Sequence, residues 1–126
     1  MAKILLAEDD ESMLNFLMLA LERAGHTVIC TRNGLDALKT CEAEGDFDLL
    51  LTDIVMPGLD GIELAQKLSD KFTDMKIMFL TGFAAMAMTK GSEAISGQTP
   101  KVMSKPFHLN DLVNEVDKIL GIEATQ

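Results

Sequence analysis

The sequence predicts an α/β fold in which a parallel five-stranded sheet carries helices on both faces. Five short apolar runs, each typical of a buried parallel strand, are spaced along the 126 residues. Longer stretches with helical hydrophobic spacing separate these runs, as crossovers between parallel strands require. The simplest doubly wound arrangement has the strand order 2-1-3-4-5, which places the ends of the first and third strands side by side. The expected strands are residues 3–7, 27–31, 47–52, 76–80 and 101–104.

The first expected helix spans residues 11–24 and has apolar residues on more than one face. Ser12 is expected to help cap its start, and Gly25 follows its end. Leu14 and Met18, four residues apart, fall on a face away from the sheet, where they are either an isolated pair or half of a homodimer contact. The predicted sheet-facing stripe is Met13, Phe16, Leu17, Ala20, Leu21 and Ala24. The expected helices are residues 11–24, 35–44, 62–71, a short or frayed helix within 83–90, and 109–120.

Composition limits the partners and the compartment. A net charge of −9 argues against direct binding to nucleic-acid backbones or anionic membranes. No apolar span of about 20 residues and no signal-like start is present, so we expect a cytoplasmic protein. Cys30 and Cys41 have no metal-ligand spacing and fit reduced, partly buried thiols. We expect one domain over residues 1–126, with 122–126 as a frayed tail and no output domain.

Polar side chains follow four of the five strands at their carboxyl ends, which meet at one edge of a parallel sheet. Glu8 and Asp9 follow the first strand, Asp53 the third, Thr81 the fourth and Lys105 the fifth. Clustered carboxylates repel one another unless a cation lies between them, and their hard oxygen atoms suit Mg²⁺ rather than zinc. A lysine and a hydroxyl can hold phosphoryl oxygens. The set is equipped for phosphoryl transfer, with Asp53 as the best nucleophile.

Each of these residues also has a simpler explanation when taken alone. Asp53 could cap a turn or helix, and the acids after the first strand could compensate a helix dipole. Thr81 and Gly82 could be an ordinary strand end, although an open Gly82 amide would also bind an anion. The Lys105-Pro106 bond is a candidate cis peptide bond, which would aim Lys105 back across the sheet edge.

The order and spacing of these motifs resemble the receiver domains of response regulators from the first strand to the last helix. The resemblance implies a CheY-like, flavodoxin-like (βα)5 fold. The motifs that carry it are Glu8-Asp9, Asp53 followed by Met56-Pro57 and Asp60-Gly61, Thr81-Gly82, and Lys105-Pro106-Phe107.

The resemblance also assigns roles at the sheet edge. It implies that Asp53 accepts a phosphoryl group from a phosphohistidine on a histidine kinase or a histidine phosphotransferase. Asp9, Asp53 and the Val55 carbonyl would bind Mg²⁺ directly, and Glu8 would act mainly through water. Such a protein is not an enzyme beyond its own phosphorylation from a phosphodonor and slow autodephosphorylation.

Further contacts to the phosphate follow from the same resemblance. Lys105 and Thr81 would hold the phosphoryl group, together with backbone amides near Val55 and Gly82. One position departs from many receivers, which carry an aromatic residue three positions before the lysine. Val102 stands there, so we expect a smaller or differently routed conformational switch, with residues 83–99 as the segment that reorders.

In detail the sequence is similar to the single-domain cell-cycle regulators called CpdR. That family is phosphorylated through a histidine phosphorelay, and its unphosphorylated form acts as an adaptor for the ClpXP protease, which implies ClpX as a partner. A chemotaxis-like shuttle that is active when phosphorylated is the alternative. A magnesium-dependent phosphohydrolase would need a second acid where Val55 stands, and a binding module with an inert site would not need the complete set. The segments that carry this similarity are residues 4–10, 49–57, 81–85 and 104–109.

Overall fold

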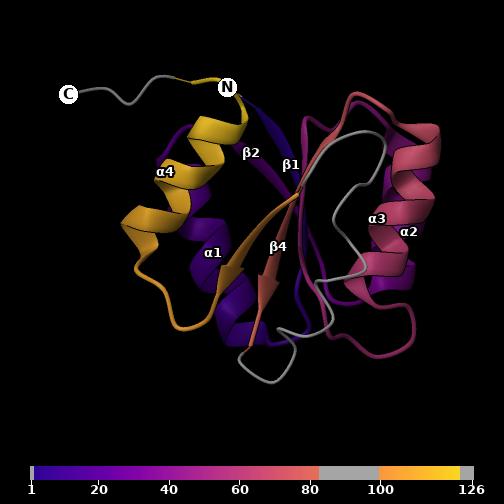
Figure 1. Cartoon of the computed structure of the whole chain (residues 1–126), viewed down its shortest axis with the longest axis horizontal. Helices are drawn as coiled ribbons and strands as arrows, with labels where there is room; N and C mark the ends of the chain where they lie inside the picture. The colour runs from indigo at the N-terminus through magenta and orange to yellow at the C-terminus, as the bar shows by residue number, and fades with distance from the viewer. Residues whose placement is uncertain (1, 83–99, 123–126) are drawn as a thin grey trace.

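The computed structural model describes residues 2–82 and 100–122 and confirms the predicted doubly wound architecture (Figure 1). All five strands are parallel, in the order β2-β1-β3-β4-β5. The strands are β1 (Lys3–Ala7), β2 (Thr27–Thr31), β3 (Leu49–Asp53), β4 (Lys76–Thr81) and β5 (Lys101–Ser104). The helices are α1 (Glu11–Arg23), α2 (Gly34–Glu44), α3 (Gly61–Lys71) and α4 (Leu109–Ile119). The helix expected within 83–90 and most of the expected tail lie outside the described residues.

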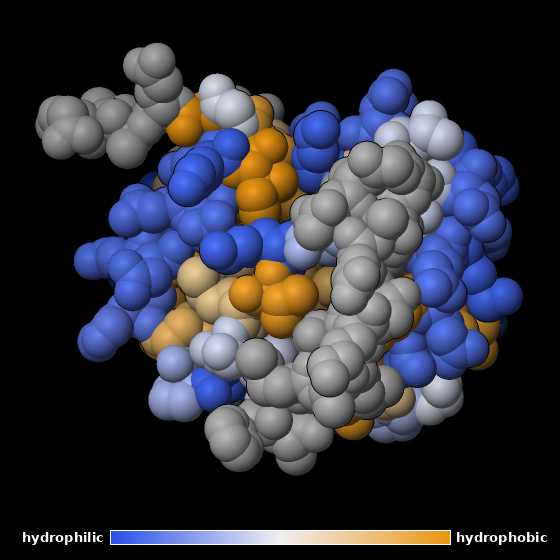
Figure 2. Space-filling model, in the orientation of Figure 1, coloured by the Kyte–Doolittle hydropathy of each residue, from blue (hydrophilic) through white to orange (hydrophobic). Residues whose placement is uncertain are grey.

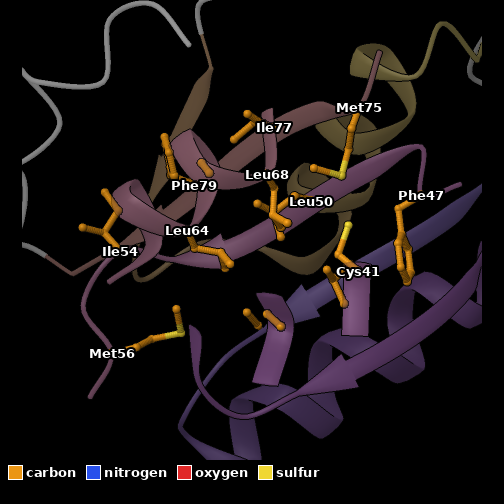
Figure 3. Close-up of a cluster of buried hydrophobic side chains, with 14 residues drawn as sticks. Cys41, Phe47, Leu50, Ile54, Met56, Leu64, Leu68, Met75, Ile77 and Phe79 are labelled. Carbon is orange, nitrogen blue, oxygen red and sulfur yellow. The ribbon is translucent and has the colours of Figure 1, made fainter. Parts of the chain in front are cut away.

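The sheet has one hydrophobic core on each face, because successive strand residues point to opposite sides. Leu50 of β3 packs into the core under α2 and α3, whereas Leu49 and Leu51 pack into the core under α1 and α4. Figure 1 shows these two helix pairs on opposite sides of the sheet. Figure 3 shows the first core, where Phe79 and Ile77 of β4 reach the same layer as Leu64 and Leu68 of α3. Burial on both faces explains why β3 is a continuous apolar run.

Three of the four helices in the described part of the chain begin with a side-chain cap after a strand and its connection. Asp10 Oδ1 accepts the Met13 amide at 3.1 Å at the start of α1. Asn33 and Asp60 cap α2 and α3 in the same way. The prediction that Ser12 caps α1 was wrong, because Ser12 already lies inside the first helical turn.

The buried face of α1 differs from the predicted one. Leu14 is only 6% exposed and lies in the core shared with α4, and Met18 packs against that core. Phe16 and Leu19 are instead 51% exposed. The expectation that Leu14 and Met18 lie on a face away from the sheet, where they could form a homodimer contact, is therefore wrong. Helix α1 buries one side against both the sheet and α4, and Leu14 is on that side. The buried residues of α1 are Leu14, Leu17, Ala20 and Leu21.

A buried histidine ties the two ends of the described chain together. His26 is 6% exposed, and its Nε2 lies 2.8 Å from Asp117 Oδ1 of α4. Its Nδ1 accepts the Ala2 amide at 3.3 Å, so Nε2 carries the proton that Asp117 accepts. This contact lies just before β2, at the amino ends of the strands. His26 therefore fastens α4 to the start of the sheet.

Both cysteines are free of disulfide bonds, as the sequence predicts. Cys30 and Cys41 are free thiols, and burial raises the pKa of Cys41 to about 11.

Figure 2 shows a mostly hydrophilic face, on which hydrophobic side chains gather in the strip between α4 and the centre of the sheet. Among the helices of the described part of the chain, none combines the length and apolar character that crossing a bilayer needs.

Candidate functional site

The strand register brings the predicted acids to one edge of the sheet. Ala7 of β1 pairs with Thr52 of β3, so Glu8 and Asp53 each take the next position at the strand ends. Asp53 in turn pairs with Leu80, one residue before Thr81. This is the topological switch point between β1 and β3, where ligands bind in open α/β sheets.

Lys105 connects the two buried carboxylates. Its Nζ lies 3.0 Å from Glu8 Oε1 and 3.0 Å from Asp53 Oδ2. The Lys105-Pro106 peptide bond is cis, as the sequence suggested. The Lys105 backbone amide donates to the Thr81 carbonyl at 2.8 Å, which holds the start of this loop beside β4. A lysine from the end of β5 thus reaches across the sheet edge to acids that follow β1 and end β3.

Burial and charge act in opposite directions on these groups. Glu8 is completely buried, and burial is the main reason that its pKa rises from 4.5 to about 7. The Asp10 amide and Lys105 oppose this increase, and the charge of Asp53 adds to it. Burial lowers the pKa of Lys105, but its contacts with Asp53 and Glu8 raise it by more, so the net shift is upward. Lys105 is therefore fully charged at neutral pH.

Three carboxylates form a cluster that fits a divalent cation. One oxygen from each of Glu8, Asp9 and Asp53 lies within 4.8 Å of the other two. Glu8 and Asp53 are buried, whereas Asp9 is exposed and open to water. Oxygen ligands with room for several waters are the preferred environment of Mg²⁺. The donor set therefore fits the predicted ion, and Val55, two residues beyond Asp53 in the chain, is 54% exposed.

Thr81 lies at the same edge, with its hydroxyl engaged elsewhere. Thr81 is completely buried, and its hydroxyl donates to the Gly82 carbonyl at 3.0 Å. A Cβ added at Gly82 would meet no atom of residues 2–82 or 100–122 within 4 Å, so none of these residues covers the backbone on that side. The sequence placed Thr81 and Gly82 correctly at the strand end but gave no indication of this hydrogen bond. Val102 of β5 is half-buried and packs against the core under α2 and α3.

Close backbone packing fixes the position of Asp53. The Gly61 amide donates to the Ile54 carbonyl at 2.8 Å, so α3 begins directly against the end of β3. A Cβ at Gly61 would collide with the Asp53 carbonyl oxygen. Only glycine allows this approach. In the Asp60-Gly61 motif, Asp60 thus caps α3, and Gly61 leaves room for the backbone at the end of β3.

A second contact at the site, between Asp10 and Glu8, was also not predicted from the sequence. The Asp10 amide donates to Glu8 Oε2 at 3.1 Å, while the Asp10 side chain caps α1. An aspartate at the junction of a strand and a helix was visible in the sequence. Its amide contact depends on how the chain turns at that junction, which spacing alone does not give.

Comparison with known proteins identifies the family. The family model described as "Response regulator receiver domain" matches residues 4–117. The chain belongs to the response regulator receiver family. It is 54% identical over 120 residues to the response regulator receiver protein CpdR of Brucella abortus, covering 95% of this chain and 98% of that protein. It is also 34% identical to the sensor kinase CckA of Brucella abortus, covering 94% of this chain and 12% of the kinase.

Solved structures agree with this assignment. A CheY-like receiver domain protein from Methanospirillum hungatei superposes with a TM-score of 0.87 at 28% identity, covering 96% of this chain and 94% of that one. A receiver domain from Clostridium thermocellum gives a TM-score of 0.86 at 22% identity, with 96% and 95% covered, and supports the fold alone. The chain is a receiver-domain response regulator of two-component signalling that resembles the receiver protein CpdR.

Proposed function

We propose that this receiver is a phosphorylation switch in which Asp53 accepts a phosphoryl group from a phosphohistidine on a histidine kinase or histidine phosphotransferase. The observation that carries the proposal is the Lys105 ammonium group, 3.0 Å from both Asp53 and Glu8, beside a cluster of three carboxylates. A nucleophilic carboxylate, a cation that can follow the transferred charge and a set of hard oxygen ligands are the parts that phosphoryl transfer requires.

In the proposed reaction a carboxylate oxygen of Asp53 bonds to phosphorus while the bond from phosphorus to the donor imidazole nitrogen breaks. Asp9, Asp53 and the Val55 carbonyl would hold Mg²⁺, with Glu8 acting through water. When bound, the ion neutralises charge between the carboxylates and the phosphoryl oxygens.

The remaining residues would stabilise the product. Lys105 would move its ammonium group from the Asp53 carboxylate to a phosphoryl oxygen, which is a short displacement because the two are already in contact. Thr81 would turn its hydroxyl from the Gly82 carbonyl toward the phosphate, leaving the open Gly82 backbone to donate its amide. With Val102 in place of an aromatic residue, this rotation has no aromatic side chain on β5 to follow it.

Phosphotransfer can be tested with a phosphorylated histidine phosphotransferase as the donor. We expect label to move to the wild-type protein and to Asp48→Asn, but not to Asp53→Asn. Asp48 is a suitable control because it precedes the same strand at the opposite end, where its carboxylate accepts the Lys3 amide. Equal labelling of Asp53→Asn would place the phosphoryl group on another residue.

We further propose that the output is a protein contact and that the unphosphorylated form acts as an adaptor for the ClpXP protease in the cytoplasm. Identity of 54% over nearly the whole length of CpdR supports this role. The net charge of −9 supports a protein partner over nucleic acid or a membrane. A shuttle that is active when phosphorylated would use the same site.

The two polarities differ in which form binds ClpX. We expect wild type without phosphodonor and Asp53→Ala with or without it to retain ClpX in a pull-down, and phosphorylated wild type to release it. Retention only after phosphorylation would instead favour the shuttle.

A further inference from the structure

The acidic run after β1 contains a residue that the proposed reaction does not use. Asp10 is exposed, yet three of its groups are engaged. Its carboxylate accepts the Met13 amide at 3.1 Å, its carbonyl accepts the Leu14 amide at 2.8 Å, and its own amide donates to Glu8 Oε2 at 3.1 Å. Asp10 therefore joins the first turn of α1 to a carboxylate of the site.

The Glu8 carboxylate depends on this bond. It is completely buried, and its two oxygens are divided between two donors, with Oε1 on Lys105 and Oε2 on the Asp10 amide. A buried carboxylate oxygen that loses its donor carries the full cost of desolvation. Without the Asp10 amide, Glu8 would rotate or share Lys105 differently, and Asp53 shares that lysine.

The side chain of Asp10 determines where its amide points. The cap holds Asp10 in an extended conformation, with φ −81° and ψ 114°, immediately before the first helical residue. One turn further on, Leu14 is buried in the core shared with α4, so the helix itself cannot shift to compensate. Loss of the cap would leave the Met13 amide without its acceptor, and the bond from the Leu14 amide to the Asp10 carbonyl would alone hold the backbone at position 10 to the helix.

We propose that Asp10 is a positioning residue: by capping α1 it holds its own backbone amide against Glu8, and so orients the carboxylate–lysine network for Mg²⁺ and the phosphoryl group. The proposal rests on the proposed function of the site. A competing explanation is that the Asp10 carboxylate acts through its negative charge. Asparagine separates the two, because it caps helices as well as aspartate does but has no charge.

The experiment measures Mg²⁺ affinity by amide chemical shifts in wild type, Asp10→Ala and Asp10→Asn, with Asn33→Ala as the matched control. Asn33 makes the same kind of cap on α2 at the same end of the sheet. We expect Asp10→Ala to weaken Mg²⁺ binding about tenfold, as for other residues that orient metal ligands. Asp10→Asn and Asn33→Ala should stay close to wild type. The amide proton of residue 10 should shift upfield in Asp10→Ala and in Glu8→Gln, but not in Asp10→Asn.

Each other result would overturn the proposal. If Asp10→Ala binds Mg²⁺ as tightly as wild type, the cap does not position Glu8. In that case the proposed function of the site still stands, provided that wild type binds Mg²⁺ and is phosphorylated. Equal weakening in Asp10→Asn would show that charge is responsible. Equal weakening in Asn33→Ala would show a general effect of lost stability. Failure of wild type itself to bind Mg²⁺ would instead reject the proposed function of the site.

Discussion

At the scale of single residues, the site is a compromise between burial and charge. Glu8 is fully enclosed and Asp53 nearly so, and the lysine from the end of β5 makes this arrangement possible by contacting both. The contact with Lys105 does not fully offset the cost of burying the Glu8 charge, and the pKa of Glu8 is therefore raised. Two predictions follow from this balance, one for each side of the ion-pair network.

The first concerns Glu8 in metal-free protein. Because its pKa rises from 4.5 to about 7 on folding, the folded state holds this proton more tightly, and that stabilisation is lost as pH rises through about 7. Between pH 5 and pH 8, the unfolding free energy of wild type should therefore fall relative to Glu8→Gln, by roughly 1–3 kcal/mol. Urea unfolding of both proteins at the two pH values measures this. Parallel pH profiles would mean that Glu8 does not bind its proton in this range.

The second concerns Lys105. Replacing it with methionine keeps the apolar stem but removes the cation between two carboxylates. Phosphorylation of Asp53 by a small acyl phosphate should slow by about 10²–10³-fold, the usual effect of removing one transition-state donor. Lys105→Arg keeps the charge with a different geometry, so its phosphorylation rate should lie between those of wild type and Lys105→Met. A methionine variant that reacts at the wild-type rate would remove Lys105 from the mechanism.

At the scale of elements, close backbone contacts set the geometry of the strand ends. Gly61→Ala places a methyl group against the Asp53 carbonyl oxygen, and α3 must shift to admit it. We expect a loss of about 1–3 kcal/mol in unfolding free energy, as for other overpacked sites. Glu63→Ala, an exposed substitution in the same helical turn, should change it by less than about 0.5 kcal/mol. Equal stability of the two variants, measured by urea unfolding, would contradict this account of the glycine.

The elements also show what sequence patterns can determine. The strands were predictable within two residues because five apolar runs end in polar or turn-forming residues, and the same strand ends identified Glu8, Asp9, Asp53 and Lys105. The face of α1 was not predictable, because apolar residues occur nearly all around that helix. Which side is buried depends on where α4 docks, with Leu112 and Val116 of α4 in the same core as Leu14.

At the scale of the whole molecule, the site lies at one end of the sheet and a structural anchor lies at the other. His26 donates to Asp117 and accepts from Ala2, so α4, the loop before β2 and the residue before β1 share one buried imidazole. Its sequence position, just after a helix-ending glycine, gave no indication of these partners, because all of them are distant in the chain. Long-range polar contacts of this kind follow from the fold and not from local spacing.

Removing this anchor should loosen α4. His26→Leu leaves the Asp117 carboxylate and the Ala2 amide without their partner, and we expect a loss of about 1–3 kcal/mol. Hydrogen exchange should rise in α4 more than in α3. His108→Leu is the matched control, because His108 is exposed at the start of α4 and makes no side-chain cap bond. Equal exchange in the two variants would argue against an anchoring role.

The most direct test of the central claim is the intact mass of the protein after incubation with a small acyl phosphate, with and without Mg²⁺. The account predicts one added phosphoryl group on wild type only when Mg²⁺ is present, and none on folded Asp53→Asn under either condition. An adduct that forms without Mg²⁺, one that persists in Asp53→Asn, or no adduct on folded wild type would contradict a phosphorylation switch at Asp53.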